Sequence, residues 1–146
     1  MEKQSLPIGM IVGRMMHMMF RVLKKRTGEQ ADVKLTIEQF GLLHAISMKE
    51  EDVIQKDMAE MMGKDKSAIL RIIDTLEEKE LVRRVVDTND RRKNFLMVTK
   101  KGEKVLEQCL KIEFELMEEL QQGLSKSDLD TFYKVINHIR SRAEKL

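Results

Sequence analysis

The sequence has few of the residues that cross-link, break or anchor a fold. Its 146 residues include one cysteine, one proline, no tryptophan and only 4% aromatic residues. A single cysteine, Cys109, excludes a disulfide within the chain and fits a reducing cytoplasm. With so few helix breakers, and with twelve methionines whose flexible side chains pack adaptably, we expect one mainly α-helical domain over residues 1–146.

A hydrophobic run long enough to cross a membrane is also missing. The most apolar early stretch, IVGRMMHMMF at residues 11–20, is interrupted by Arg14 and His17. A membrane-spanning helix needs about 20 apolar residues, and no export signal is recognisable. We therefore expect a soluble, cytoplasmic protein that has no membrane partner.

Patterns typical of enzymes and metal sites are absent as well. His17, His44 and His138 are far apart and lack metal-ligand spacing, and the sequence has no Gly-rich phosphate loop or nucleophile motif. We expect no catalytic residue, no metal site and no cofactor. Cys109 is interpreted as a small apolar residue, with redox sensing as the alternative.

The net charge is only +2, but the charge is unevenly distributed. Residues 64–101 contain 11 Lys and Arg against 7 Asp and Glu, whereas residues 103–123 contain 2 against 6. This distribution suits a protein that turns one basic part towards phosphates and keeps an acidic helix away from them. The alternative is a solvated surface of mixed charge.

The segment LVRRVVDTNDRRKNFLMVTKKG, residues 81–102, has the pattern of a β-hairpin with a basic tip. Apolar and β-branched residues suit two strands, and the turn formers at 87–90 separate them. The turn is expected to hold Arg91, Arg92 and Lys93 in solvent. Because a purely structural hairpin needs no cations at its tip, the pattern predicts a wing that binds DNA.

A helix-turn-helix pattern precedes this hairpin. Ala59 supplies a small residue where two helices cross, and Gly63 tolerates positive φ in the connection. The second helix is expected at Lys66–Lys79. Its apolar positions are Ile69, Ile72, Ile73 and Leu76. Its opposite face carries Ser67, Leu70, Arg71 and Asp74. Together with Lys64 and Lys66, that face is predicted to contact DNA.

The run from Gly63 to Gly102 resembles the winged helix-turn-helix core of the MarR family of bacterial transcriptional regulators. The resemblance rests on Ser67, Arg71, Asp74, Leu76–Glu78, the Asp90-x-Arg92 pair, Thr99 and Gly102. It implies that residues 36–102 bind DNA and that residues 1–35 and 103–146 form dimerisation helices. It also implies a homodimer on a pseudo-palindromic double-stranded operator, with Arg92 in the minor groove. Because Asp90 and Arg92 are two residues apart, their side chains can lie on the same side of a turn or strand, and we expect Asp90 to orient Arg92.

Four positions depart from the family pattern. Ala68 and Leu70 stand where small hydroxyl residues are common, so base readout is expected to use thymine methyl groups. Glu80 replaces a usual glycine, and a left-handed backbone there would cost ~1 kcal/mol. Asn89 replaces a frequent arginine, which removes one phosphate contact.

Three further helices are expected before the second helix of the helix-turn-helix. The first runs from about Pro7 to Gly28 and is apolar nearly all round, so it must be covered on several sides. A capping box formed by Thr36 and Gln39 starts the next, which ends near Met48. Residues 49–53 are expected to be a charged connector to a helix that begins near residue 54 without a Ser or Thr cap.

Two helices are expected after the wing. Thr99 is predicted to cap a long helix that ends near Gly123, and Ser125 or Ser127 to cap the last helix. The apolar stripes of these helices and of the first helix are expected to form a dimer interface. The alternative is a monomeric helical packing.

The first helix also carries the candidate effector site. His17 and Arg21 are four residues apart, and Met15 precedes them. The resemblance implies a small anionic aromatic effector that releases a repressor from DNA. The alternative for His17 is a structural role with an internal hydrogen-bond partner.

Two functions remain open. The first is a ligand-responsive DNA-binding regulator, and the second is a winged-helix protein-interaction module or antirepressor that does not bind DNA. Lys66, Arg71 and Arg92 favour the first, because a protein-binding derivative is expected to lose cations on both DNA-reading elements.

Overall fold

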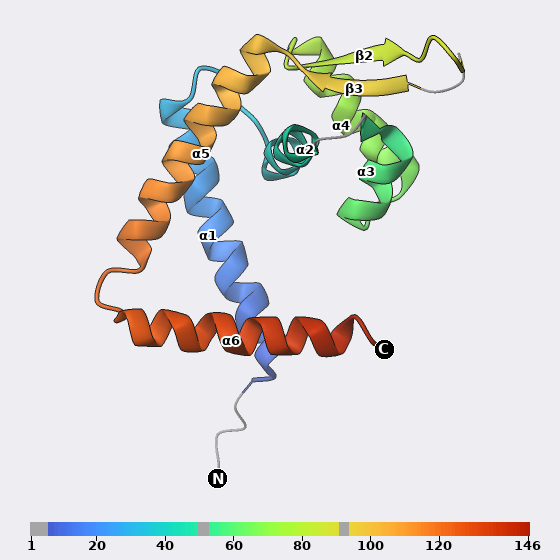
Figure 1. The fold of residues 1–146 in the computed structure, drawn as a ribbon. Helices are drawn as coiled ribbons and strands as arrows, with labels where there is room; N and C mark the ends of the chain where they lie inside the picture. Colours follow the sequence, from blue (N-terminus) through green and yellow to red (C-terminus); the bar gives the residue numbers. More distant parts are fainter. Residues whose placement is uncertain (1–5, 50–52, 91–93) are drawn as a thin grey trace. The chain divides into compact units, whose positions relative to one another are not determined.

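The computed structural model describes residues 6–49, 53–90 and 94–146. The chain forms, in order, α1 (Ile8–Gln30), α2 (Ile37–Met48), β1 (Val53–Ile54), α3 (Gln55–Met62), α4 (Lys66–Glu78), β2 (Val82–Val86), β3 (Asn94–Val98), α5 (Lys100–Leu120) and α6 (Lys126–Ala143) (Figure 1). The predicted mainly helical class with a β-hairpin wing is confirmed. The contacts divide the chain into two compact units, Met1–Glu113 and Phe114–Leu146, and α5 contributes to both.

Capping side chains set the starts of two helices as the sequence predicts. At α2, the Gln39 backbone N–H donates to the Thr36 hydroxyl, and the Thr36 N–H donates to the Gln39 side chain, both at 3.1 Å. At α6, Ser125 and Asp128 form the same reciprocal pair at 3.0 Å. Ser125, and not Ser127, is therefore the cap of the last helix. Such pairs satisfy backbone donors that the first helical turn leaves without partners.

The core of the first unit forms where α2, α3 and α4 pack on one another and on the sheet (Figure 1). The four apolar positions predicted for the buried side of α4 are all buried: Ile69, Ile72, Ile73 and Leu76. Gly63 ends α3 with φ of 60°, as expected for the turn before α4. One side of α4 is thus fixed by the core, and its other side faces away from it.

The sheet has three antiparallel strands in the order β1-β3-β2, one more than the predicted hairpin. Of the connector expected at residues 49–53, residues 50–52 lie outside the described residues. Val53 belongs to β1, where it pairs with Leu96, and Ile54 pairs with Phe95. A strand of two residues is too short to show the alternation that reveals strands in a sequence. Its partner is more than forty residues away in the chain, so only the tertiary structure reveals it.

The wing begins and ends at a tight junction of backbone atoms. The Thr99 N–H donates to the Leu81 carbonyl oxygen at 3.0 Å, and the Thr99 hydroxyl accepts from the Gly102 N–H at 3.0 Å. The predicted cap of α5 is therefore confirmed. A Cβ at Gly102 would overlap the Leu81 carbonyl oxygen, which explains why glycine stands here.

The backbone of Glu80 has φ of 62°, so the left-handed conformation considered for this departure from the family pattern is present. No helix within the described ranges combines the length and apolarity needed to cross a membrane.

Candidate nucleic-acid interface

The exposed side of α4 carries the residues predicted to read DNA. Lys66, Ser67 and Arg71 are exposed, and Leu70 is half-buried. Their placement follows from the helical period, because the buried isoleucines and Leu76 occupy the other side. The structure thus brings together, on one helix surface, two cations, a hydroxyl group and a branched apolar side chain.

Asp65, which the sequence interpretation did not single out, organises the start of this helix. Its carboxylate accepts from the Ala68 backbone N–H at 2.7 Å and from the Ser67 hydroxyl at 2.9 Å. The Ala68 hydrogen bond, followed by that from Ser67, holds the pKa of Asp65 below its ordinary value. An aspartate directly before a helical apolar repeat is a recognisable N-cap signal, so this residue could have been predicted.

Lys64 lies in the turn before α4 and contacts α2. Its ammonium group is 2.9 Å from the Glu38 carboxylate, and the Lys64 side chain is half-buried whereas that of Glu38 is exposed. Exposed ion pairs contribute about 0 to 1 kcal/mol, so this contact is easily exchanged for a phosphate. Lys64 remains a candidate for backbone contacts to DNA.

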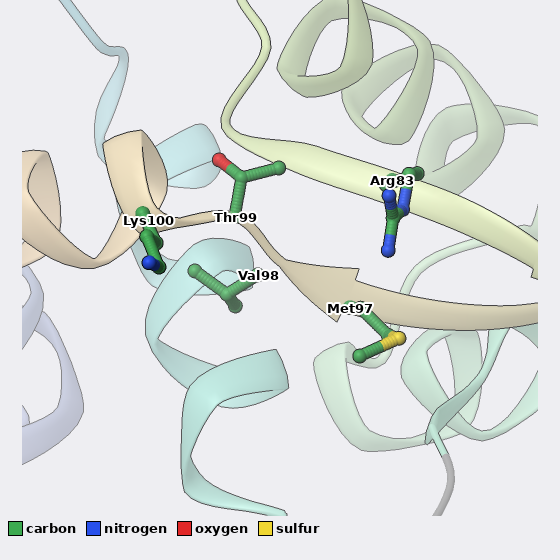
Figure 2. Close-up of a pocket in the computed structure, with 5 residues that line it drawn as sticks. All are labelled: Arg83, Met97, Val98, Thr99 and Lys100. Carbon is green, nitrogen blue, oxygen red and sulfur yellow. The ribbon is translucent and has the colours of Figure 1, made fainter.

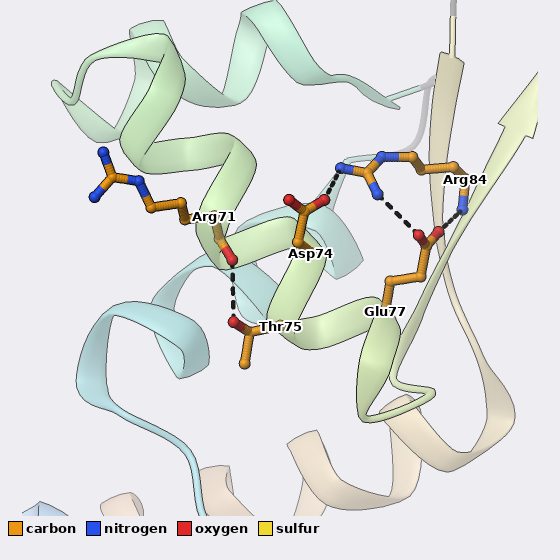
Figure 3. A network of polar contacts seen from close by, with 5 residues as sticks. All are labelled: Arg71, Asp74, Thr75, Glu77 and Arg84. Carbon is orange, nitrogen blue, oxygen red and sulfur yellow. Dashed lines mark hydrogen bonds and ion pairs between the residues drawn. The ribbon is translucent and has the colours of Figure 1, made fainter.

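Arg71 and Asp74 lie three residues apart on α4, a spacing at which opposite charges often pair. Here they do not pair: the Arg71 guanidinium points away from Asp74, whose carboxylate binds Arg84 at 2.6 Å (Figure 3). Within the described ranges Arg71 forms no ion pair, and its carbonyl oxygen accepts from the Thr75 hydroxyl at 3.1 Å. The guanidinium of Arg71 is therefore available to a ligand.

The wing strands pair in regular register, from Val82 opposite Val98 to Val86 opposite Asn94. In the turn, the Asn89 N–H donates to the Asp87 side chain at 2.9 Å. Asp90 is half-buried. Arg91, Arg92 and Lys93, the predicted cationic tip, lie outside the described residues, so the orientation of Arg92 by Asp90 stays a prediction.

A hollow of about 420 Å³ opens at the base of the wing (Figure 2). It is lined by Arg83, Met97, Val98, Thr99 and Lys100. Arg83 and Met97 are directly opposite in the β2–β3 register, and both are exposed. Arg83 and Lys100 give this edge of the wing a positive charge.

Residues predicted for an effector site lie on α1, where Met15, His17 and Arg21 are all exposed. Cys109 is buried in the core of the first unit. Burial, with a smaller contribution from Glu113, raises the pKa of its thiol. A protonated, enclosed thiol suits an apolar packing role. Among the described side chains, no group of His, Cys, Asp and Glu is placed to hold a metal ion.

Residues 35–93 match the model of the MarR family. The matched segment is less than half of the chain. It contains α2, β1, α3, α4 and β2, and thus both helices of the helix-turn-helix and the first strand of the wing.

Solved structures extend the likeness over nearly the whole chain. A mutant MarR from E. coli in complex with operator DNA has a TM-score of 0.79 and 22% identity, covering 92% of this chain and 94% of that one. The S. aureus MepR–DNA complex has a TM-score of 0.82 and 20% identity, covering 94% and 99%. A MarR-family regulator from Rhodococcus sp. has a TM-score of 0.77 and 24% identity, covering 94% and 96%. The helices on either side of the MarR-family segment therefore share that fold.

Proposed function

We propose that this protein is a dimeric, sequence-specific DNA-binding repressor of the cytoplasm that a small-molecule effector releases from its operator. The proposal rests above all on the exposed face of α4, where Lys66 and Arg71 lie on a helix fixed from behind by buried side chains. This face lies within the MarR-family segment, immediately before a wing. Two structures of the same fold are complexes with DNA. The proposal assigns no catalytic step to the chain.

Exposed apolar side chains support the dimer. On α1, Ile8 is 56% exposed and Met18 is 58% exposed, and on α6 Phe132 and Tyr133 are 45% and 54% exposed. Apolar surface of this extent on helices marks an interface with another molecule. We assign residues 1–35 and 103–146 to contacts between two copies and residues 36–102 to DNA. Symmetric pairing would place the two α4 helices in successive major grooves.

The first experiment measures assembly and binding together. Sedimentation at micromolar concentration should give a dimer, and fluorescence anisotropy should find tight binding to a pseudo-palindromic site from the gene's own upstream region. Half-sites should be about one helical turn apart. A monomer, or equal affinity for a scrambled duplex, contradicts the proposal. Binding to no duplex would favour the alternative of a protein-interaction module or antirepressor.

Two variants of α4 separate base reading from phosphate contact. Arg71→Ala should cost roughly 1 to 3 kcal/mol on the operator and less on random DNA, if Arg71 reaches a base edge. Lys66→Ala should weaken binding to the operator and to random DNA by the same factor. Lys111→Ala, an exposed cation on the acidic helix α5, serves as the matched control. Equal losses on both duplexes for Arg71→Ala would reduce Arg71 to a phosphate contact.

We place the effector at α1, with Met15, His17 and Arg21 as its contacts, and expect a small anionic aromatic compound. By linkage, such a ligand must bind the DNA-free form more tightly than the DNA-bound form. Once a ligand that weakens operator binding has been found, His17→Ala and Arg21→Ala should abolish its effect without changing operator affinity. Unchanged release by both variants would show that the site lies elsewhere.

A further inference from the structure

Arg84, on β2, connects the wing to α4 through three hydrogen bonds (Figure 3). Its guanidinium donates to the Asp74 carboxylate at 2.6 Å and to the Glu77 carboxylate at 2.8 Å. Its backbone N–H donates to the second oxygen of Glu77 at 3.2 Å. One residue of the wing is therefore tied to two successive turns of the DNA-reading helix. We call this arrangement the Arg84 clamp.

The clamp has the geometry of a strong contact. A planar guanidinium holds its N–H donors in a fixed fork and so binds two carboxylates at once in defined directions, whereas a lysine ammonium acts as a point charge on a flexible stem. The Arg84 side chain is only 22% exposed, so water competes less with these bonds than at an open surface. Burial lowers the pKa of Arg84, but hydrogen bonds to Asp74 and Glu77 outweigh it, and the pKa is raised. The guanidinium of Arg84 therefore keeps its positive charge.

The position of Arg84 in β2 lets the clamp restrain the wing beyond its base. The base of the hairpin is held by buried Leu81 and Val82. Arg84 is the third of five residues in β2, two residues beyond Val82 and towards the tip. A contact there holds a part of β2 that the buried residues at its base do not hold.

We propose that Arg84 is a positioning residue for DNA binding: by fixing β2 against α4, it sets where the wing tip stands relative to the reading face of the helix. This inference rests on the proposed DNA-binding function. Arg84 does not need to touch DNA, because its donors are directed at Asp74 and Glu77. Arg84 affects operator affinity only by changing where the wing places the cations at its tip.

A double-mutant cycle with Arg92 tests this route. Arg84→Met should weaken operator binding by about tenfold, the equivalent of about 1.4 kcal/mol. In an Arg92→Ala background, where the tip has already lost its contact, the same substitution should weaken binding by less than about threefold. Equal losses in both backgrounds overturn the proposal, because they would mean that Arg84 acts by direct contact or by general destabilisation.

Arg83→Met is the matched control. Arg83 is adjacent in sequence and carries the same charge, but its side chain is on the other face of β2 and forms no ion pair within the described ranges. Arg83→Met removes a positive charge and no clamp contact. It should therefore weaken operator binding by the same factor in the wild-type and the Arg92→Ala backgrounds. If Arg83→Met shows the same background dependence as Arg84→Met, charge and not position explains the result.

A second measurement needs no DNA and so distinguishes failure of the clamp from failure of the proposed function. Nitroxide labels at Lys66→Cys on α4 and Thr88→Cys on the wing, in a Cys109→Ala background, report the distance between the two elements. Excess unlabelled protein limits each dimer to one labelled copy. Arg84→Met should broaden the distance distribution, and Arg83→Met should leave it unchanged. If the methionine variant does not fold, Arg84→Lys, which keeps the charge but loses the rigid fork of donors, should give intermediate broadening. An unchanged distribution overturns the proposal whatever the DNA affinity.

Discussion

The hydroxyl of Thr99 donates a hydrogen bond of 2.6 Å to the carbonyl oxygen of Glu80, and so joins the end of the wing to its beginning. The same hydroxyl oxygen accepts from the Gly102 N–H and caps α5. One side chain therefore closes the hairpin and starts the following helix.

Thr99→Val should remove both hydrogen bonds while keeping the shape of the side chain. We expect the free energy of unfolding, measured by urea denaturation, to fall by about 1 to 2 kcal/mol. Thr99→Ser restores the hydroxyl and should recover most of the loss. If the serine and valine variants are equally unstable, the threonine methyl group and not its hydroxyl stabilises the junction.

Glu80→Gly should stabilise the protein. The left-handed backbone at φ 62° strains any residue with a Cβ, and glycine relieves roughly 1 kcal/mol of that strain. The Glu80–Lys101 ion pair at 3.6 Å is exposed, so its loss should count for little. Glu80→Ala, which removes the carboxylate but keeps the Cβ, is the control. A gain in thermal stability for alanine equal to that for glycine would contradict the strain argument.

Gly102→Ala should have the opposite effect. The added Cβ would overlap the backbone oxygen of Leu81, which cannot move without displacing the hairpin. Overpacking of this kind costs about 1 to 3 kcal/mol, and the melting temperature should fall accordingly. Gly28→Ala provides the contrast, since nothing lies within 4 Å of its new Cβ and alanine favours the helix. If Gly102→Ala and Gly28→Ala have equal melting temperatures, the backbone at Leu81 must accommodate the added Cβ at little cost.

Acid should weaken the cap of α4. Because the folded protein holds the pKa of Asp65 below its ordinary value of 3.8, the ionised carboxylate stabilises the fold above that value. This stabilisation is lost as the pH falls through the folded pKa. Asp65→Asn still caps the helix but does not titrate. Relative to this variant, the wild type should lose free energy of unfolding below about pH 4 and none above about pH 5. If the free energies of unfolding of the wild type and of Asp65→Asn differ by a constant amount over that pH range, titration of Asp65 does not explain the acid sensitivity.

Substitutions at Asp90 and Arg92 test how the wing tip contacts DNA. If its carboxylate orients Arg92 towards a narrow minor groove, Asp90→Ala should weaken operator binding although it removes a negative charge. Arg92→Ala should weaken binding more and flatten its salt dependence, with little change in melting temperature. Tighter binding by Asp90→Ala would mean that charge repulsion by Asp90 outweighs its orienting role.

Features that depend on neighbours in the chain were predictable from the sequence. The capping box at Thr36, the positive φ at Gly63 and the division of α4 into buried and outward faces follow from residues within one or two helical turns. The strain at Glu80 was expected only on the condition that this site needs a left-handed backbone, because the family pattern has glycine there. The other three features follow from physical rules that act over a few residues.

Features that depend on distant partners were not predictable in the same way. The two-residue strand β1 has no period of its own and exists because β3 pairs with it. The Arg84 clamp joins positions seven and ten residues apart across a turn, and a sequence full of charges offers many such pairs. Asp74 was assigned with Arg71 to the outward face of α4, yet its carboxylate binds Arg84. Tertiary packing decides which of these charges meet.

The contact between Gly102 and Leu81 divides the wing into a part that tolerates change and a part that does not. Because the two strands are joined at this neck, added or deleted residues at the turn need not shift α4 or α5. Relatives of this protein can therefore have a longer wing tip, or one with other charges, while they keep the glycine that contacts Leu81. If the proposed function holds, changes in operator preference during evolution would then begin at the tip, without any change in the sequence of α4.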